Sequence, residues 1–561
     1  MIESCDVVVV GAGAAGMAAA CVAALEGCSV LLLEQAPLVG GTTAISGGMV
    51  WLPANHRAAE AGMPDTVAAA RTYLAQTVPG QDRRRVEAFL RHGAEALRYL
   101  EERTALQLQP VPTYPDYYPD LPGATLRGRV LEPQPYDGRA LGRDFALLRP
   151  PLPEFTLFGG MMISRQDIPH LRRVGRSARS ALYVSRLLTR HALQRLRSPR
   201  GTSLYLGNAL AAQLLQSVRQ CGVQLRTDTG VERLLRGDAG RVIGVSIVDA
   251  CGARGSVQAR RGVILATGGL SHCPELRQRF VPAHAGALSA TVGGDGVARG
   301  ARLALGAGAQ LSQPTQSGAF WVPASVFTRV DGSQGVFPHT VTDRAKPGLI
   351  AVGRDGQRFA NEAVSYHEFV RAQLAQQDRA LPAWLVCDAR FLWKYGLGRV
   401  RPFAWSVRGE VAQGYLKRAA SIAALAQEIG VPTAALQCTI DDYNRHARAG
   451  HDPAFGRGGD AYQRHLGDAE QQPNPCVAPI ERGPFYAVAV WPADLGMSAG
   501  IETDDTARVL SSAGLPIPGL YACGNDMASV MEGAYPGPGI TLGPALTFAY
   551  LAARDAARAI E

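Results

Sequence analysis

The stretch that decides the fold is residues 6–16, "DVVVVGAGAAG", close to the start of the chain. A run of valines leads into Gly11-x-Gly13-x-x-Gly16, an alanine-rich segment follows, and a second apolar run ends at Glu34. In a dinucleotide-binding βαβ unit, the first glycine makes the turn, the second admits the pyrophosphate, and the third lets helix and strand pack closely. An acid about twenty residues downstream can accept hydrogen bonds from ribose hydroxyls. The sequence therefore predicts a strand, a helix and a second strand around one dinucleotide.

Further glycine-rich segments indicate which dinucleotide it is. They read "GGTTAISGGMVWLP" (40–53), "GVILATGG" (262–269) and "GLYACGND" (519–526). Small polar residues and glycines in the first can wrap a ribityl chain and a flavin edge, and dehydrogenases that use only NAD do not usually need such extra anchors. We therefore expect FAD, bound by a discontinuous domain with another unit inserted between the last two segments. No histidine stands beside the first segment, so we expect the FAD to be held non-covalently.

Length and composition limit the class of protein. The 561 residues are enough for two or three domains, and no apolar run reaches the roughly 18–20 residues of a spanning helix. The apolar N-terminal run has no basic leading segment and no cleavage site, so we expect no signal peptide. The ten cysteines form no C-x-x-C pair and no histidine cluster accompanies them. This argues against a metal site or a disulfide framework and indicates a reducing cytoplasm.

A glycine- and proline-rich stretch near the C-terminus, "GAYPGPGITLGPAL" (533–546), precedes an apolar run that can form a helix. Gly537, Gly539 and Gly543 allow the backbone to approach a ligand closely. The helix that follows would aim its N-terminus, with its partial positive charge, at that ligand.

This arrangement resembles the fumarate reductase-type flavoproteins over nearly the whole chain. The resemblance implies an α/β fold in which a Rossmann-type FAD domain (1–323 and 498–561) carries an inserted α+β catalytic domain (324–497). It also implies that the C-terminal helix points at the pyrimidine end of the flavin and stabilises its reduced, anionic form. Together, the motifs and the resemblance assign the cofactor contacts to Gly11, Gly13, Ala14, Ala15, Gly16, Glu34, Gly40, Gly41, Thr42, Thr43, Ser46, Gly47, Gly48, Val231, Ala266, Thr267, Gly268, Gly524, Asn525, Gly539, Ile540 and Leu542.

Tyrosines are conspicuous in the parts of the chain that remain. "YPDYYPDLPG" (114–123) carries three, "NEAVSYHEF" (361–369) carries Tyr366, and Tyr535 stands in the C-terminal stretch. A dicarboxylate enzyme needs arginines and a histidine as clamps, whereas a ketone dehydrogenase needs donors for one carbonyl oxygen and a base for the adjacent carbon acid. Any one of these tyrosines alone could equally pack a core edge with its hydroxyl satisfied.

The patterns P-D-Y-Y, N-E-x-x-x-Y and Y-P-G-P-G, in this order, resemble those of the 3-ketosteroid Δ1-dehydrogenases. The resemblance implies FAD-dependent 1,2-dehydrogenation of a 3-ketosteroid in sterol or steroid degradation. The Tyr535 hydroxyl and the Gly539 N–H would hold the C3 carbonyl oxygen, and Tyr366 would take the C2 proton. Tyr117 would favour the phenolate of Tyr366 by hydrogen bonding, while a hydride passes from C1 to flavin N5.

Three other functions stay open at this point: a 3-ketosteroid Δ4-(5α)-dehydrogenase, a fumarate reductase-type dicarboxylate oxidoreductase, and a flavin electron carrier without steroid turnover. The electron acceptor is not fixed by the sequence, and a quinone is one candidate. Smaller roles are expected elsewhere: Asp295 caps a helix, and Asn361 and Glu362 brace the loop that bears Tyr366. His367 is expected to point away from Tyr366 and receives no role.

The positive charge of the chain is concentrated in one segment. Residues 161–200 hold ten arginines against one acid, Asp167, although the formal net charge of the whole chain is only +9. Within the insertion 124–200, a helix or two is expected between Pro169 and Pro199, with leucines, Tyr183 and Val184 over much of the circumference. Five arginines fall on one stripe at helical spacing: Arg172, Arg179, Arg186, Arg190 and Arg197. The preceding "FTLFGGMMI" (155–163) predicts a mobile apolar loop.

A basic helix with an apolar side beside an apolar loop is typical of an interfacial membrane element. We therefore expect residues 152–200 to hold a cytoplasmic enzyme against the anionic inner face of the membrane. This placement would suit a poorly soluble substrate, and the insertion loosely resembles that of the cholest-4-en-3-one form of the enzyme. A solvated charged face and an oligomer contact are the alternatives. Nucleic acid is not expected, because the chain shows no recognised nucleic-acid-binding fold.

Overall fold

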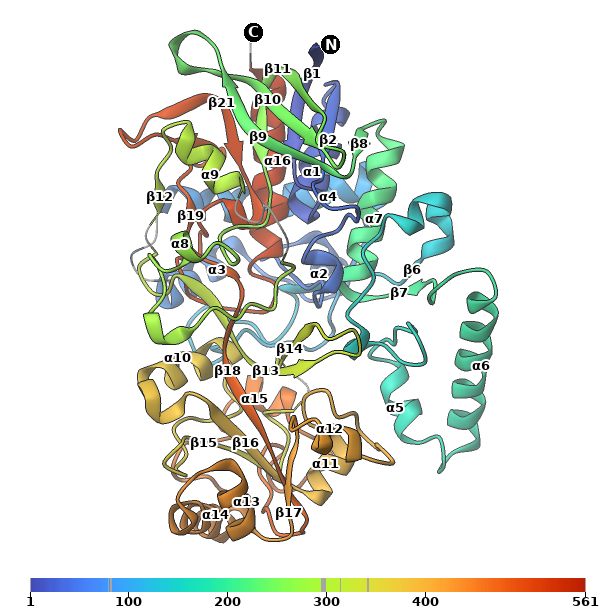
Figure 1. Ribbon diagram of the computed structural model, residues 1–561, viewed down its shortest axis with the longest axis vertical. Coiled ribbons are helices and arrows are strands. Elements are labelled where there is room, and N and C mark those ends of the chain that lie inside the picture. The colour runs from blue at the N-terminus through green and yellow to red at the C-terminus, as the bar shows by residue number, and fades with distance from the viewer. Residues whose placement is uncertain are drawn as a thin grey trace.

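The computed structural model describes residues 2–78, 80, 83–293, 299–312, 314–340 and 343–559. Two sheets organise the chain, one above the other in Figure 1, and both ends of the chain lie at the top, beside the upper sheet. Two helices of the basic insertion stand to the side of both.

Parallel strands form the centre of the upper sheet, in the order β21–β11–β1–β2–β8. Their bounds are β1 Ile2–Val10, β2 Val30–Leu33, β8 Gln224–Arg226, β11 Arg254–Leu265 and β21 Pro516–Ala522. Antiparallel strands extend this sheet, namely β9 Thr229–Arg236, β10 Val242–Asp249 and β20 Arg508–Leu510. Val7, Val8 and Val9 of β1 are fully buried, as the uninterrupted apolar run of a central parallel strand requires.

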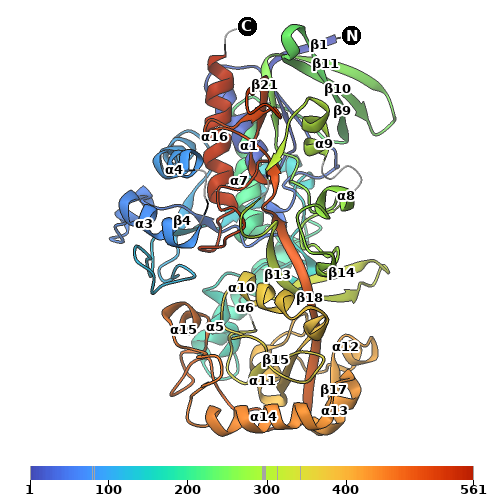
Figure 2. The ribbon, with the colours of Figure 1, turned by 90° about the vertical axis from the view of Figure 1, so that its left-hand side faces the viewer.

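Long helices pack against the upper sheet and against one another (Figure 2). They are α1 Ala14–Leu25, α4 Arg83–Arg103, α7 Leu206–Gln220 and α16 Leu542–Arg558. Alanines make up much of α1 and its first ten residues are all buried, because small side chains let it lie close to the sheet and to α16. Shorter elements of this part are α2 His56–Glu60, α3 Val67–Thr77, α8 Pro274–Arg277, α9 Arg299–Gly306, β3 Val50–Trp51, β4 Leu108–Pro110, β5 Val130–Pro133, β6 Tyr136–Asp137, β7 Ser203–Leu204, β12 Leu311–Ser312 and β19 Gly500–Ile501.

The lower sheet is antiparallel, in the order β14–β13–β18–β16–β15, with β17 also paired to β18. Its strands are β13 Ala319–Thr328, β14 Gln334–Pro338, β15 Leu349–Val352, β16 Ala383–Asp388, β17 Lys417–Ala419 and β18 Phe485–Met497. Its helices are α10 Tyr366–Ala375, α11 Ala389–Tyr395, α12 Arg408–Ala412, α13 Ile422–Ile429, α14 Thr433–Ala447 and α15 Ala461–Leu466. The long strand β18 runs from this sheet up to the parallel one (Figures 1 and 2).

The expected fold class is confirmed: a parallel α/β sheet made of separated segments, with an antiparallel α+β unit inserted between them. The expected domain limit at 497/498 coincides with the end of β18, whereas the limit at 323/324 falls inside β13. Asp295, expected to cap a helix, lies outside the described residues.

The basic insertion forms two helices, α5 Asp167–Arg172 and α6 Ala178–Arg195. The expected stripe is therefore interrupted: Arg172 ends α5, and the other four arginines lie on α6 or directly after it. The loop expected to be mobile is a small hairpin, in which Leu157 and Met161 exchange two backbone hydrogen bonds of 2.8 Å. Met161 and Met162 are buried, so only the phenylalanines of "FTLFGGMMI" stay exposed as an apolar patch. Within the described ranges, no helix is long and apolar enough to cross a bilayer.

Candidate active site

The turn after β1 leaves no space for side chains except at one point. An added Cβ at Gly11 (φ +104°) would lie 2.3 Å from the Ala266 carbonyl oxygen, and one at Gly16 would lie 1.8 Å from the Gly11 oxygen. An added Cβ at Gly13, in contrast, would meet no atom within 4 Å, and the nearest atom to one at Gly41 is Cα of Gly13 at 3.9 Å. The open space therefore lies in front of the N-terminus of α1, where backbone amides and the helix dipole favour a phosphate. This geometry fits the pyrophosphate of FAD.

Glu34 directly follows β2 and is held by the backbone. Its Oε2 accepts a hydrogen bond from the Ala12 N–H at 2.8 Å, and its Oε1 accepts one from the Ala36 N–H at 2.9 Å. Burial raises the pKa of this carboxyl, and the two N–H groups oppose the shift. A carboxylate has about four acceptor sites, so capacity remains for ribose hydroxyls.

The segments around residues 262–269 and 519–526 meet through a residue that sequence analysis overlooked, Asp526. Its fully buried carboxylate accepts hydrogen bonds from the Thr267 N–H, the Thr267 hydroxyl (2.9 Å) and the Gly269 N–H (2.9 Å). Gly524 lies against the first turn of α1, because an added Cβ there would be 2.8 Å from Cβ of Ala15. The only sequence signal for Asp526 was its position directly after Asn525.

Most of the other expected cofactor residues belong to the segment 40–48 or directly follow β11. Several of them have hydrogen-bond partners within the protein. The Thr43 hydroxyl accepts from the Ala14 N–H, and the Thr42 hydroxyl accepts from the Val292 N–H. Ser46 donates to the Thr43 carbonyl and accepts from the Gly48 N–H. Open space surrounds Gly47 and Gly268, whereas Gly40 packs against Ala44 and Ala211. Val231 lies in β9, paired with Ile247 of β10.

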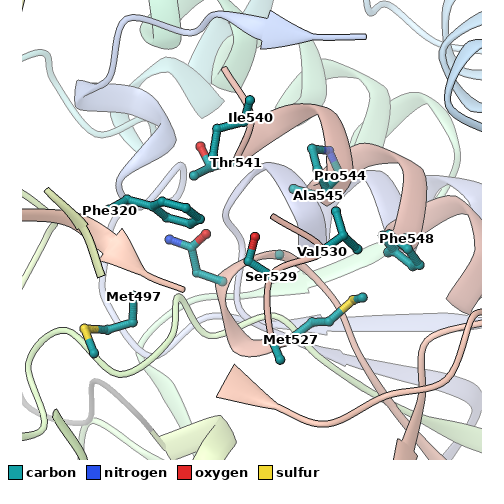
Figure 3. A pocket seen from close by; sticks show the side chains of 13 residues that line it. Phe320, Met497, Met527, Ser529, Val530, Ile540, Thr541, Pro544, Ala545 and Phe548 are labelled. Atoms are coloured by element: carbon teal, nitrogen blue, oxygen red, sulfur yellow. The ribbon is translucent and has the colours of Figure 1, made fainter. Parts of the chain in front are cut away.

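A small cavity opens at the N-terminus of α16, where Phe320, Ser529 and Thr541 surround a hollow (Figure 3). Of the expected cofactor residues, Gly524, Asn525 and Ile540 line it, whereas Gly539 and Leu542 do not. Gly539 (φ +95°) lies against strand β3, because an added Cβ would be 2.5 Å from the Met49 oxygen. No acceptor in the described part of the chain takes the Gly539 N–H, which stays available to a ligand.

The three expected catalytic tyrosines come together in one chain of hydroxyls. Tyr117 donates to Tyr366 at 2.9 Å, and Tyr366 donates to Tyr535 at 2.9 Å. All three side chains are buried, and their ring centroids are 5.1 to 5.7 Å apart. Burial raises the pKa of Tyr366, and the hydrogen bond from Tyr117 lowers it. Burial raises the pKa of Tyr535 to about 12.

Two loops and a helix bring these tyrosines together. Tyr366 is the first residue of α10, which the Ser365 side chain caps. The Pro536 carbonyl accepts hydrogen bonds from the Tyr117 N–H at 2.9 Å and from the Tyr73 hydroxyl at 2.6 Å. An added Cβ at Gly537 would lie 2.6 Å from Nε1 of Trp51, so glycine is required there.

The loop that bears Tyr366 is braced by Asn361 and Glu362, as expected. The Asn361 amide donates to Phe455 O and Gln463 Oε1, and Glu362 forms ion pairs with Arg358 and Arg457.

Two further aromatic side chains adjoin Tyr535: Phe320, which was not identified from the sequence, and His367, which was expected to have no role. Phe320, in β13, packs edge-on against Tyr535 at 5.4 Å and also lines the cavity, so the tyrosines adjoin the cavity. His367 is fully buried with its ring 5.6 Å from Tyr535, and its Nδ1 accepts from the Trp321 N–H at 3.1 Å. Burial lowers the pKa of His367 to about 3, so it is neutral near neutral pH.

With this geometry established, comparisons place the chain among known proteins. The family model described as an FAD binding domain matches residues 6–542. The chain belongs to this FAD-binding family. The flavoprotein is 41% identical to 4-oxocyclohex-2-ene-1-carboxylate 5-dehydrogenase from Sinomonas cyclohexanicum, over 99% of this chain and 94% of the relative.

It is also 36% identical to 3-oxosteroid 1-dehydrogenase from Mycolicibacterium smegmatis, over 98% of this chain and 97% of the relative. A similar solved structure is 3-ketosteroid Δ1-dehydrogenase from Sterolibacterium denitrificans in complex with 1,4-androstadiene-3,17-dione. It has a TM-score of 0.91 and 36% identity, and the match covers 99% of both chains. The expected cofactor, FAD, and the expected class, a flavin-dependent oxidoreductase, are confirmed by these matches.

The first prediction concerns Asp526. In the Asp526→Ala variant, two buried N–H groups and a hydroxyl lose their acceptor, at a cost of about 1–3 kcal/mol for each unsatisfied group. We expect FAD affinity to fall by about tenfold or more, measured by titrating the apoprotein with FAD and following flavin fluorescence. Asp249→Ala is the matched control, because that carboxylate also accepts two backbone N–H groups, but in an exposed turn. Equal loss of FAD affinity in both variants would contradict the role of Asp526.

Proposed function

We propose that the protein is an FAD-dependent dehydrogenase that introduces the C1=C2 double bond of a 3-ketosteroid. The observation that carries this proposal is the chain of three buried tyrosine hydroxyls beside the cavity at the start of α16. Relatives named 3-oxosteroid 1-dehydrogenase, similar over nearly their whole length, support the same reaction.

Each group has a distinct chemical task in this proposal. The Tyr535 hydroxyl and the unpartnered Gly539 N–H hold the C3 carbonyl oxygen and stabilise negative charge on it as the C2 proton leaves. Tyr366 accepts that proton, and the hydrogen bond from Tyr117 stabilises the phenolate form of Tyr366 that this step requires. When bound, FAD supplies the acceptor for the hydride that leaves C1. Loss of this proton and this hydride leaves the C1=C2 double bond.

A second candidate substrate follows from the relative with 41% identity, whose name gives a six-membered ring ketone that carries a carboxylate. The same tyrosines could act on such a ring, because the reaction needs only the ketone and the two adjacent carbons. Anaerobic addition of a 3-ketosteroid, of 4-oxocyclohex-2-ene-1-carboxylate or of succinate separates the candidates. Only a compound that is a substrate reduces the bound flavin and bleaches its absorbance. Bleaching by succinate would indicate a dicarboxylate oxidoreductase.

The second prediction uses the same assay. With a 3-ketosteroid, Tyr366→Phe should reduce flavin about 100-fold or more slowly than the wild type, because the general base is lost, while FAD and steroid still bind. Tyr521→Phe is the matched control, since its buried hydroxyl donates to Asp555 far from the cluster. A Tyr366→Phe rate above one tenth of the wild-type rate would exclude Tyr366 as the base. Bleaching by 4-oxocyclohex-2-ene-1-carboxylate alone would exclude the steroid as the substrate.

The third prediction concerns the carbonyl oxygen. Tyr535→Phe removes a hydrogen-bond donor that matters most as negative charge develops, so kcat should fall by the equivalent of about 2–4 kcal/mol while KM changes little. Steady-state kinetics with a soluble C19 3-ketosteroid measures both constants. A defect confined to KM would show that Tyr535 only lines the pocket.

Membrane docking is a further part of the proposal, because α6 exposes two adjacent rows of side chains. Ser180, Val184 and His191 face the protein, whereas Leu182, Leu193 and Leu196 are 56%, 60% and 80% exposed. The arginines at 179, 186, 190 and 197 lie beside this row of leucines at helical spacing and are also exposed.

The hairpin before the helices exposes another apolar side chain next to α6. Phe158 is 66% exposed, and its carbonyl oxygen lies 2.9 Å from Nε2 of His191 on α6. A row of exposed leucines beside a row of arginines is suited to an anionic phospholipid surface, which can take up apolar side chains and attract positive charge. We propose that residues 152–200 dock the enzyme on the cytoplasmic face of the membrane, where a poorly soluble sterol ketone would be dissolved.

The fourth prediction concerns this surface. Replacing Arg179, Arg186, Arg190 and Arg197 together by Gln should weaken sedimentation with anionic vesicles and slow turnover of a vesicle-dissolved sterol ketone, while sparing a soluble C19 steroid. High salt should release part of the wild type, because the Debye length falls from about 8 Å to about 3 Å at 1 M. The control replaces four exposed arginines elsewhere, Arg98, Arg233, Arg236 and Arg254, by Gln. If the α6 variant and the wild type sediment equally with vesicles, the arginine stripe does not bind membrane and is a solvated face or an oligomer contact.

A further inference from the structure

One buried arginine of the lower unit has no carboxylate partner. Arg344 is 2% exposed, and within the described ranges no acidic side chain lies within 4 Å of its guanidinium. Other buried arginines differ: Arg129 pairs with Asp65 and Asp116, Arg277 pairs with Asp494, and Arg457 pairs with Glu362. Because an uncompensated buried charge is costly, the environment of Arg344 needs an explanation.

The hydrogen bonds of Arg344 lead to the loop that bears Tyr366. The guanidinium donates to the carbonyl oxygens of Glu362 (2.8 Å) and His339 (3.0 Å), with longer contacts of 3.4 Å to Thr340 and Val364. It also lies 4.9 Å from the ring centroid of Phe369, one turn into α10. Arg344 thus holds the backbone directly before Tyr366. Burial raises the pKa of Tyr462, whose ring packs against that of Tyr117, and the charge of Arg344 opposes this shift.

One other arginine lies close to the tyrosines: the exposed Arg165, which pairs with Glu132, is 5.7 Å from the ring centroid of Tyr114, and the His465 ring is 4.7 Å from the same ring. Tyr366 faces the phenols of Tyr114, Tyr117 and Tyr535. Tyr117 in addition contacts Tyr462 at 4.6 Å. The groups that act on Arg344 itself are Asp343, Arg457, Tyr117 and Tyr462. Asp343 directs its carboxylate to His339, to the Gly398 N–H and to the Arg344 backbone N–H, and the Glu362 carboxylate is taken by Arg358 and Arg457.

This arrangement meets a need of the proposed reaction. A free phenol has a pKa of about 10, and burial raises the pKa of Tyr366 further because it disfavours the anion. A hydrogen bond from Tyr117 shares the negative charge of the phenolate between two phenols, but it adds no positive charge to the cluster. A buried guanidinium nearby does, and its effect is strong where water is excluded.

We propose that Arg344 is the counter-charge of the tyrosine cluster: a positioning residue whose buried, unpaired guanidinium makes the phenolate of Tyr366 and Tyr117 accessible at working pH. This proposal rests on the proposed function, because only a base needs the phenolate. Arg344 touches neither substrate nor cofactor in this account and acts through the tyrosines. The anion belongs to the coupled cluster, not to one residue.

The fifth prediction follows from the sign of this interaction. Loss of the positive charge raises the pKa of the cluster, so the rising limb of kcat/KM against pH should move to higher pH by about one unit in Arg344→Gln. Arg344→Lys retains the charge but not the planar set of donors, so its limb should stay within about half a unit of the wild type, even if stability falls. Arg457→Gln is the matched control. It removes a neighbouring buried arginine that has a carboxylate partner, and it should lower stability without moving the limb.

Three outcomes would overturn the proposal: an unshifted limb in Arg344→Gln, a limb raised equally in Arg344→Lys, or the same shift in Arg457→Gln. If Arg344→Gln does not retain FAD, the lysine variant decides between charge and hydrogen bonding. A second readout does not depend on turnover. The near-ultraviolet tyrosinate absorbance of the wild type minus that of Tyr366→Phe reports the ionisation of the cluster directly. The same pair of measurements in the Arg344→Lys background should give an unchanged pKa, even if no ring ketone proves to be a substrate.

Discussion

The carbonyl oxygen of Pro536 is the point on which the geometry of the active site depends. It accepts the backbone N–H of Tyr117 and the hydroxyl of Tyr73, and so ties the loop that bears Tyr117 to the loop that bears Tyr535. Hydrogen bonds between hydroxyls require separations of about 2.7–2.8 Å, with a tolerance of a few tenths of an ångström. Without this joint, two loops more than four hundred residues apart would have to reach that tolerance by side-chain packing alone.

Behind the joint lies a second layer that keeps these loops rigid. The Trp51 indole donates to Asp116 at 2.8 Å, and the fully buried Arg129 bridges Asp116 and Asp65. Burial raises the pKa of Asp116 to about 6, and Arg129 opposes that shift. In this layer the guanidinium lies between two carboxylates. The guanidinium of Arg344, in contrast, has no carboxylate within 4 Å among the described residues. The difference corresponds to their tasks: Arg129 holds a loop in place, whereas Arg344 stands beside the loop of the residue that must become an anion.

Much of the fold and of the site could be predicted from the sequence because the informative residues are constrained by backbone geometry. Gly11, Gly16 and Gly537 have no room for a side chain, and such constraints leave fixed spacings that are recognisable in a single sequence. Asp526, Phe320 and Arg344 could not be found in the same way. Each acts on a partner far away in the chain, and its own neighbours in the sequence do not indicate that partner. Five arginines were placed on one stripe because helical spacing alone does not show where a helix ends. The structure ends α5 at Arg172 and starts α6 after Ser177, whose side chain caps it.

The pairing of β13 with β18 has a mechanical consequence. The chain passes between the upper and lower units along these two strands, and they are hydrogen-bonded to each other from Ala319 opposite Met497 to Ala324 opposite Trp491. Two separate linkers would bend easily and act as a hinge. Two strands hydrogen-bonded to each other are stiffer and resist bending within the plane of the sheet. Arg277 and Ser271 clamp Asp494 within this ribbon and stiffen it further. The paired ribbon therefore opposes one direction of opening between the two halves of the catalytic centre.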